Sequence, residues 1–323
     1  MNETLFGEFP SQQSRVGIAA ATSMGVDTFR LMSEQGQVNY VGLAVGTALR
    51  SFFPEDLSRS QLQSHPHQAE FFFAMTNLSV AVNNFMDLYP TANHDDKLSL
   101  DDAWRFTTTS VNRTIGKLPH DEQSYYKHVM NSYKREIVFL ERYVRTNVLD
   151  RQELQAYRQI MNAINVWHLG AGLFTHDQIR SLGFEFMLKP HAGWSFEALK
   201  RKYQWMMSDN PLDGPQRKFA ALFQVVMGMQ LIDDAIDKPS DQRINAPTLH
   251  MPHNERMRQM DAYFRRAELF GVSKPLTLAI RSGFTGFKQL LTGISDGDRQ
   301  REHGVFVKSL KYGSSSFDRS LKT

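Results

Sequence analysis

The residues best suited to do chemistry form an acidic stripe at the end of an apolar segment. They are Gln230, Asp233, Asp234, Asp237 and Asp241, and they follow the mainly apolar residues 222–229. All but Asp234 are spaced 3, 4 and 4 residues apart, which places them on one face of an α-helix. Carboxylate oxygens suit Mg²⁺, which takes one or two carboxylates and leaves its other positions to water or phosphate oxygens. The spacing therefore indicates a metal site for a phosphorylated ligand.

A solvated helix end is the alternative interpretation of the same stripe. Pro239 lies just downstream, and aspartates next to proline are common in turns. The segment before Asp233 is apolar on all sides, which is typical of a helix inside a large bundle. Carboxylates in such a place cost free energy unless a cation binds to them. The pattern therefore favours the metal site.

A second polar cluster comes near the end of another apolar segment, residues 69–88. Its members are Asn83, Asn84, Phe85, Asp87, Asp95 and Asp96. Asn83 and Asp87 are four residues apart and share a helix face. An asparagine-rich helix end is the ordinary explanation. The competing interpretation pairs this cluster with the acidic stripe. Asn83 and Asp233 are 150 positions apart and each comes late in an apolar helix, so the two clusters would face each other across a cavity.

The hydrophobic periodicity is helical along nearly the whole chain, and no convincing strand pattern appears. Helices are predicted over residues 15–33, 38–52, 66–88, 99–115, 120–147, 150–174, 195–208, 214–237, 253–270 and 273–292. This number exceeds a four-helix bundle and predicts a single large bundle of about ten helices around a central apolar cavity. We expect one all-α domain over residues 1–303 and a flexible tail over residues 304–323.

Composition narrows the possible partners. The chain has 323 residues with 41% hydrophobic and 22% charged, so we expect a sizeable core. The net charge of +3 comes without a block of lysines and arginines, which argues against nucleic acid. The absence of cysteine excludes disulfides and thiolate metal sites. The N-terminus has no signal-peptide pattern and residues 71–82 are too short to span a membrane, so we expect a cytoplasmic protein with no integral membrane segment.

The motifs resemble those of the class I isoprenoid synthase superfamily, which includes trans-isoprenyl diphosphate synthases and terpene synthases. Residues 230–237 are similar to its second aspartate-rich motif, Q-x-x-D-D-x-x-D, and Asp241 matches a further aspartate. Residues 83–87 fall where its first motif, D-D-x-x-D, would lie. Residues 46–50 resemble its G-K-x-x-R loop, and residues 167–174 are a weaker counterpart of its K-T-G-A segment.

The resemblance implies an all-α bundle in which the two motifs face each other across a deep cavity. It implies two or three Mg²⁺ ions, with Mn²⁺ as a substitute, that bridge carboxylates to the diphosphate of an allylic prenyl substrate. Loss of diphosphate then generates a carbocation, which the cavity must keep dry.

The resemblance also assigns roles to individual residues. The implied metal ligands are Asp233, Asp237, Asp241 and Asp87, with Asp95 or Asp96 as an alternative to Asp87. The implied catalytic residues are Asp233, Asp234, Asp237, Asn83 and Asp87. The implied substrate contacts are Gln230, Arg50, Lys238, Arg243 and Phe85. Aromatic faces stabilise carbocations, and Phe71, Trp167, Phe174 and Phe223 serve either that role or ordinary core packing.

The departures from the family pattern bear on the reaction. Asn83 and Asn84 replace two acids of the first motif, and Thr47 replaces the lysine of the G-K-x-x-R loop. Chain elongation holds a second diphosphate largely through cationic groups such as this lysine. The loss of the lysine therefore favours a terpene cyclase, which handles one prenyl diphosphate. The alternatives are a prenyl-chain-joining synthase, a non-catalytic regulatory partner of one, and an unrelated all-α scaffold. A homodimer is compatible with each of these.

Overall fold

The protein is described from a computed structural model. The structure describes residues 71, 74, 75, 78, 79, 82, 111–172, 174–189, 193–210, 214–236, 251–278 and 280–282. This part of the chain is 83% helical and contains no strand, which confirms the all-α prediction. Three expectations depend on residues outside these ranges and stay predictions. They are the bundle of about ten helices around a cavity, the domain over residues 1–303 and the tail over residues 304–323.

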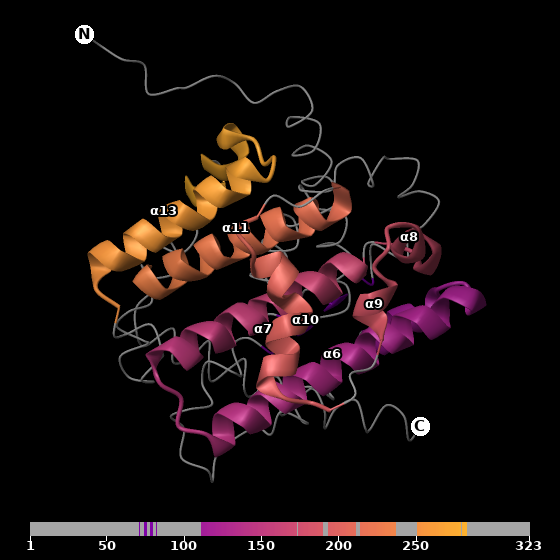
Figure 1. The fold of residues 1–323 in the computed structure, drawn as a ribbon. Helices are drawn as coiled ribbons and strands as arrows, with labels where there is room; N and C mark the ends of the chain where they lie inside the picture. The colour runs from indigo at the N-terminus through magenta and orange to yellow at the C-terminus, as the bar shows by residue number, and fades with distance from the viewer. Residues whose placement is uncertain are drawn as a thin grey trace, which may run out of the picture.

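Five long helices and two short ones carry the described fold. They are α6 (His120–Thr146), α7 (Arg151–Ala171), α8 (His176–Ser181), α9 (Glu185–Leu188), α10 (Phe196–Met207), α11 (Gly214–Ile236) and α13 (His253–Leu269). In Figure 1, α13, α11, α7 and α6 follow one another across the molecule, and α10 crosses the last three. Helix α11 contacts α13 on one side and α7 and α10 on another, so the helix with the acidic stripe has an interior position.

The long helices begin and end close to the predicted residues. The range predicted for α11 was 214–237, and the helix occupies Gly214–Ile236. Helix α7 begins at a capping box, in which the side chain of Asp150 accepts from the backbone N–H of Glu153 at 2.8 Å. The side chain of Glu153 accepts in return from the backbone N–H of Asp150 at 3.0 Å. Reciprocal capping of this kind starts a helix at a defined residue.

Helices α8 and α9 were not predicted. They have six and four residues, which is too short for a hydrophobic period to show. A capping box nevertheless marks the start of α8, because the backbone N–H of Thr175 donates to Gln178 at 2.7 Å and Thr175 accepts from the backbone N–H of Gln178. This T-x-x-Q pattern was the sequence signal that could have revealed α8.

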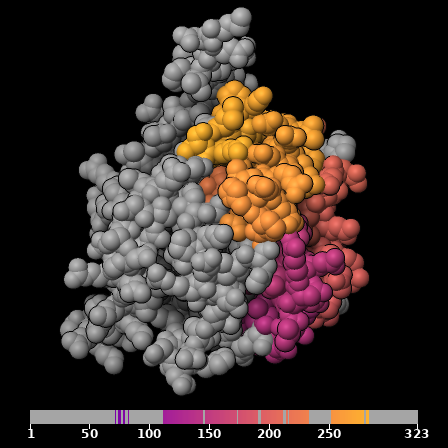
Figure 2. All heavy atoms as spheres, turned by 90° about the vertical axis from the view of Figure 1, so that its left-hand side faces the viewer, coloured from indigo at the N-terminus to yellow at the C-terminus, as the bar shows by residue number. Residues whose placement is uncertain are grey.

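The core is continuous from α6 through α7 and α11 to α13. Its largest fully buried side chains are Trp167, Tyr126, Tyr133, Tyr203, Phe71, Phe184, Phe219 and Phe223. An exposed ion pair also joins α7 to α13, with Arg151 Nη2 2.9 Å from a carboxylate oxygen of Glu255. Figure 2 shows this side of the molecule, where the orange atoms of α13 lie next to magenta atoms from the region where α6 ends and α7 begins.

None of the described helices combines the length and the apolar character that crossing a membrane requires.

Candidate functional site

Helix α11 carries the first part of the acidic stripe. It starts at Gly214, whose φ of 52° favours glycine, and Pro215 follows in the first turn, where a missing N–H costs no helical hydrogen bond. The helix continues to Ile236, so Gln230, Asp233 and Asp234 all lie in regular helical backbone. Gln230 and Asp233 are three residues apart and therefore share a face. The helical register assumed for this half of the stripe is correct.

Burial along α11 follows the predicted pattern of an interior helix. Every position from Phe219 to Ile232 is buried except Val226 and Gln230. These two residues are four apart, so they lie on one face, and Asp233 continues the same face one turn later. Between Phe219 and Ile232 this is the one half-buried face of the helix, and the sequence places the acidic stripe in its continuation.

The opposite face of α11 is closed by α13. A Cβ atom on Gly228 would lie 2.8 Å from Cε2 of Phe264, so the backbone of α11 approaches this ring too closely for any other residue. Gly228 and Gln230 are two residues apart and point in nearly opposite directions on a helix. Gln230 therefore lies on the side of α11 away from α13.

Helix α7 lies beside α11 and has its own buried polar side chains. Asn162 Nδ2 is 3.4 Å from the sulfur of Met227 and donates to the backbone oxygen of Arg158 at 3.1 Å. Asn165 Oδ1 accepts from the hydroxyl of Tyr133 on α6 at 2.8 Å. These amides are bonded within the bundle, which is how buried polar groups are normally accommodated.

The predicted metal site is only partly within the described residues. The backbone of Asp233 and Asp234 belongs to α11, and Gln230 is described in full. The other predicted site residues lie outside the described residues: Arg50, Asn83, Phe85, Asp87, Asp95, Asp96, Asp237, Lys238, Asp241 and Arg243. The described side chains contain no group of three or more acidic or histidine residues able to hold a metal ion. The chemistry of the stripe itself, several carboxylates and one amide on one helix, fits a hard divalent cation.

The four aromatic residues that fitted two roles in the sequence belong to the core. Trp167 packs against Phe219 with ring centroids 5.4 Å apart, and Phe174 lies 6.1 Å from the same ring. Gly170 allows this packing, because a Cβ at this position would overlap the ring of Phe219. The segment that resembled K-T-G-A is therefore a helix-packing junction here. Phe71 and Phe223 are fully buried in the same core.

Sequence reasoning missed a buried ion pair between α6 and α10. The Nζ atom of Lys202 lies 2.5 Å from Oε1 of Glu136, and the hydroxyl of Tyr203 donates to Oε2 at 2.6 Å. Burial raises the pKa of the Glu136 carboxyl, while the ammonium of Lys202 and the hydroxyl of Tyr203 oppose the rise. The sequence signal that could have revealed the pair is that Glu136 and Lys202 each occupy a position on the apolar face of their helix.

No protein-family model, curated protein or solved structure shows significant similarity to this chain.

Proposed function

We propose that this chain is a Mg²⁺-dependent class I isoprenoid synthase. It ionises an allylic prenyl diphosphate, releases diphosphate and forms a cyclised or rearranged terpene. The supporting observation is the burial pattern of α11, in which Val226 and Gln230 are the half-buried positions between Phe219 and Ile232, on the helix face that contains the Asp233 position one turn later. An interior helix tolerates carboxylates at its end most readily where a cation compensates them.

The same face of α11 suits both ends of such a substrate. Val226 presents an apolar side chain one turn before Gln230, and the acids begin one turn after it. A prenyl chain would contact the apolar part of this face, and its diphosphate would lie at the acidic end. The neighbouring Met229, Leu231 and Ile232 are buried, so Gln230 is the accessible position among the described residues of this turn.

Each residue of the stripe has a role in this proposal. Asp233, Asp237 and Asp241 would hold the metal, and Asp234 would ligate it or support a ligand. Gln230 would orient a carboxylate through its amide. When bound, Mg²⁺ would neutralise the charge that grows on the departing diphosphate. Arg50, Lys238 and Arg243 would contact that diphosphate directly.

Incubation of the purified protein with C10 to C25 prenyl diphosphates and Mg²⁺ tests this function. The expected result is release of diphosphate together with a terpene hydrocarbon or alcohol in the mass spectrum. A longer prenyl diphosphate would instead identify a chain-joining synthase. Absence of diphosphate release from every substrate would overturn the proposal and favour a non-catalytic partner.

The variant Asp233→Ala tests whether diphosphate release depends on the acidic stripe of α11. We expect diphosphate release to fall by about a hundredfold or more, because catalysis loses a group that helps to stabilise the leaving charge. Asp121→Ala is the matched control, since Asp121 is an exposed aspartate on α6. Full activity in Asp233→Ala would separate the acidic stripe from the reaction.

A further inference from the structure

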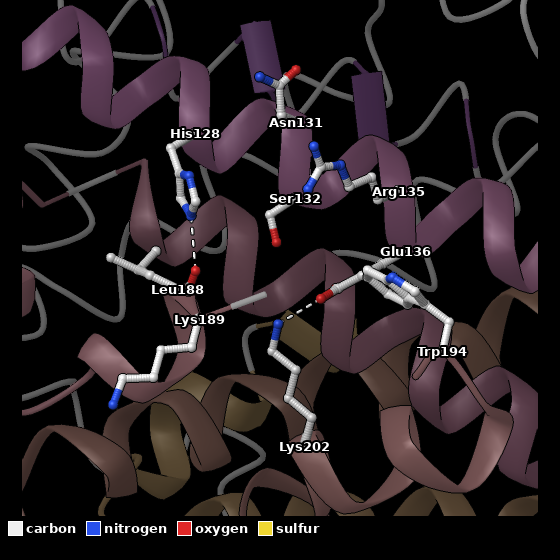
Figure 3. A pocket seen from close by; sticks show the side chains of 9 residues that line it. All are labelled: His128, Asn131, Ser132, Arg135, Glu136, Leu188, Lys189, Trp194 and Lys202. Atoms are coloured by element: carbon white, nitrogen blue, oxygen red, sulfur yellow. Dashed lines mark hydrogen bonds and ion pairs between the residues drawn. The ribbon is translucent and has the colours of Figure 1, made fainter. Parts of the chain in front are cut away.

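A small polar pocket lies where α6, the end of α9 and α10 meet (Figure 3). Its volume is about 80 Å³. Pockets for drug-sized ligands are larger, about 300–1,000 Å³. The size therefore suits a single small ion, or one terminal group of a larger ligand.

The floor of the pocket is the buried pair of Glu136 and Lys202. Their side chains are 0% and 3% exposed, and Tyr203 holds the second carboxylate oxygen. A buried ion pair contributes little net stability compared with apolar residues of similar volume, because both charges must be desolvated. Besides joining α6 to α10, the pair lines a pocket, and titratable groups with perturbed pKa values gather at functional sites.

The walls of the pocket add more cations and hydrogen-bond donors but no further carboxylate. Arg135 and Lys189 join Lys202, so three cations line the pocket against the single carboxylate of Glu136. Asn131 and Ser132, which are neighbours on α6, add an amide and a hydroxyl to the lining. In Figure 3, the Ser132 hydroxyl points toward the side where Glu136 and Lys202 meet. The pocket has an excess of positive charge.

One wall of the pocket is held in place by a hydrogen bond between helices. His128 Nε2 lies 2.8 Å from the backbone oxygen of Leu188 at the end of α9. A carbonyl oxygen only accepts, so Nε2 carries the proton. The contact ties α9 to α6 and preorganises the space between them.

We propose that this pocket binds a small oxyanion, a phosphate or carboxylate group. Arg135 is the principal ligand, because its planar guanidinium donates two parallel hydrogen bonds to such a group. The Ser132 hydroxyl and the Lys202 ammonium donate from the other sides, and Glu136 with Tyr203 fixes the position of that ammonium. This site is independent of α11, so its test does not depend on the prenyl diphosphate reaction.

Calorimetric titration with inorganic phosphate, and separately with acetate, tests the site at matched ionic strength in chloride. We expect saturable binding of one anion per chain. Arg135→Gln should weaken it about tenfold to a hundredfold, as expected for loss of a hydrogen bond to a charged group. Arg142→Gln is the control, because Arg142 is exposed on the same helix seven residues later and does not line the pocket. That variant should bind as tightly as the wild type.

The titrations distinguish phosphate from carboxylate as the ligand, and a specific anion site from a general effect of surface charge. Tighter binding of phosphate identifies a phosphoryl group, and tighter binding of acetate identifies a carboxylate. Absence of saturable binding of both anions to the wild type would overturn the proposal. Equal weakening in Arg135→Gln and Arg142→Gln would overturn it as well, since that result indicates only a general effect of surface charge. Thermal unfolding of both variants confirms that they fold.

Discussion

Two interior regions of the molecule treat buried polar groups in different ways. In the region of α6, α7 and α10, the central buried groups pair between helices, as Glu136 meets Lys202 and Asn165 meets Tyr133, while Nε2 of His168 has no partner within the described residues. On α11, the amide of Gln224 is fully buried, and neither its nitrogen nor its oxygen has a hydrogen-bond partner within the described residues. The first region contains pairs that join its helices, whereas the fully buried amide on α11 makes no such pair within the described residues.

This difference separates groups that specify the fold from groups that need another explanation. A bonded pair fixes which helices meet, because only one arrangement satisfies both members. An unpaired amide costs free energy, roughly 1–3 kcal/mol. Helix α11 therefore contains one buried amide that does not stabilise the fold through a described hydrogen bond. The predicted acidic stripe begins later on the same helix.

Breaking the pair between α6 and α10 should have the largest effect on stability. Lys202→Met leaves the Glu136 carboxyl buried without its cation, and we expect a loss of about 3–5 kcal/mol in the free energy of unfolding by urea. Arg151→Met breaks the exposed pair with Glu255, in which the side chains are 60% and 34% exposed, and serves as the control. That variant should lose at most about 1 kcal/mol. Equal losses in the two variants would show that burial of the pair is irrelevant.

The dependence of stability on pH should be governed in part by His168 on α7. Burial lowers its pKa from 6.5 to about 3, and its Nδ1 donates to the backbone oxygen of Ile164 at 2.8 Å. The unfolded chain takes up a proton below pH 6.5 while the native state does not. Stability is therefore complete above that pH and falls by about 1.4 kcal/mol per unit as pH drops from 6.5 toward 3.

Urea unfolding at a series of pH values measures this slope. His168→Leu removes the titrating group, so its stability should fall less steeply below pH 6.5 than that of the wild type. The carboxyl groups titrate equally in both proteins, so their contribution cancels in the difference between the two stability profiles. Parallel profiles for the two proteins would contradict the assignment of a neutral, buried imidazole.

The smallest effect should be a gain in stability on α11. Gln224→Met replaces the unpaired amide by an apolar side chain of similar volume, so we expect unfolding to cost about 1 kcal/mol more. The control is Gln204→Met on the exposed face of α10, where the change should stay within about 0.5 kcal/mol. A loss of stability in Gln224→Met would show that the amide has a partner and would weaken the contrast between the two regions.

The sequence was informative where a signal is local. Helix α11 was predicted within one residue, because its apolar run is long and Gly214 and Pro215 mark its start. The helical spacing of Gln230 and Asp233 needed no tertiary information, and it is correct. The short helices α8 and α9 escaped because four to six residues show no period.

Partners across the fold could not be predicted. Glu136 and Lys202 are 66 residues apart, and nothing local indicates that α6 and α10 bring them together. The same limit applies to the two polar clusters around Asn83 and Asp233, whose facing arrangement stays a prediction. The sequence also left the role of the aromatic residues open. Trp167 and Phe174 fitted both carbocation stabilisation and core packing, and in the structure they pack in the core around Phe219.

Electron paramagnetic resonance of Mn²⁺ is the most direct test that the end of α11 holds metal with diphosphate. Titration of the protein with Mn²⁺ in the presence of diphosphate gives the number of ions bound per chain. Binding of two or three ions by the wild type, with fewer in Asp233→Ala and no change in Asp121→Ala, is the predicted result. Mn²⁺ binding that is independent of diphosphate, or identical in all three proteins, would contradict a metal site on this helix.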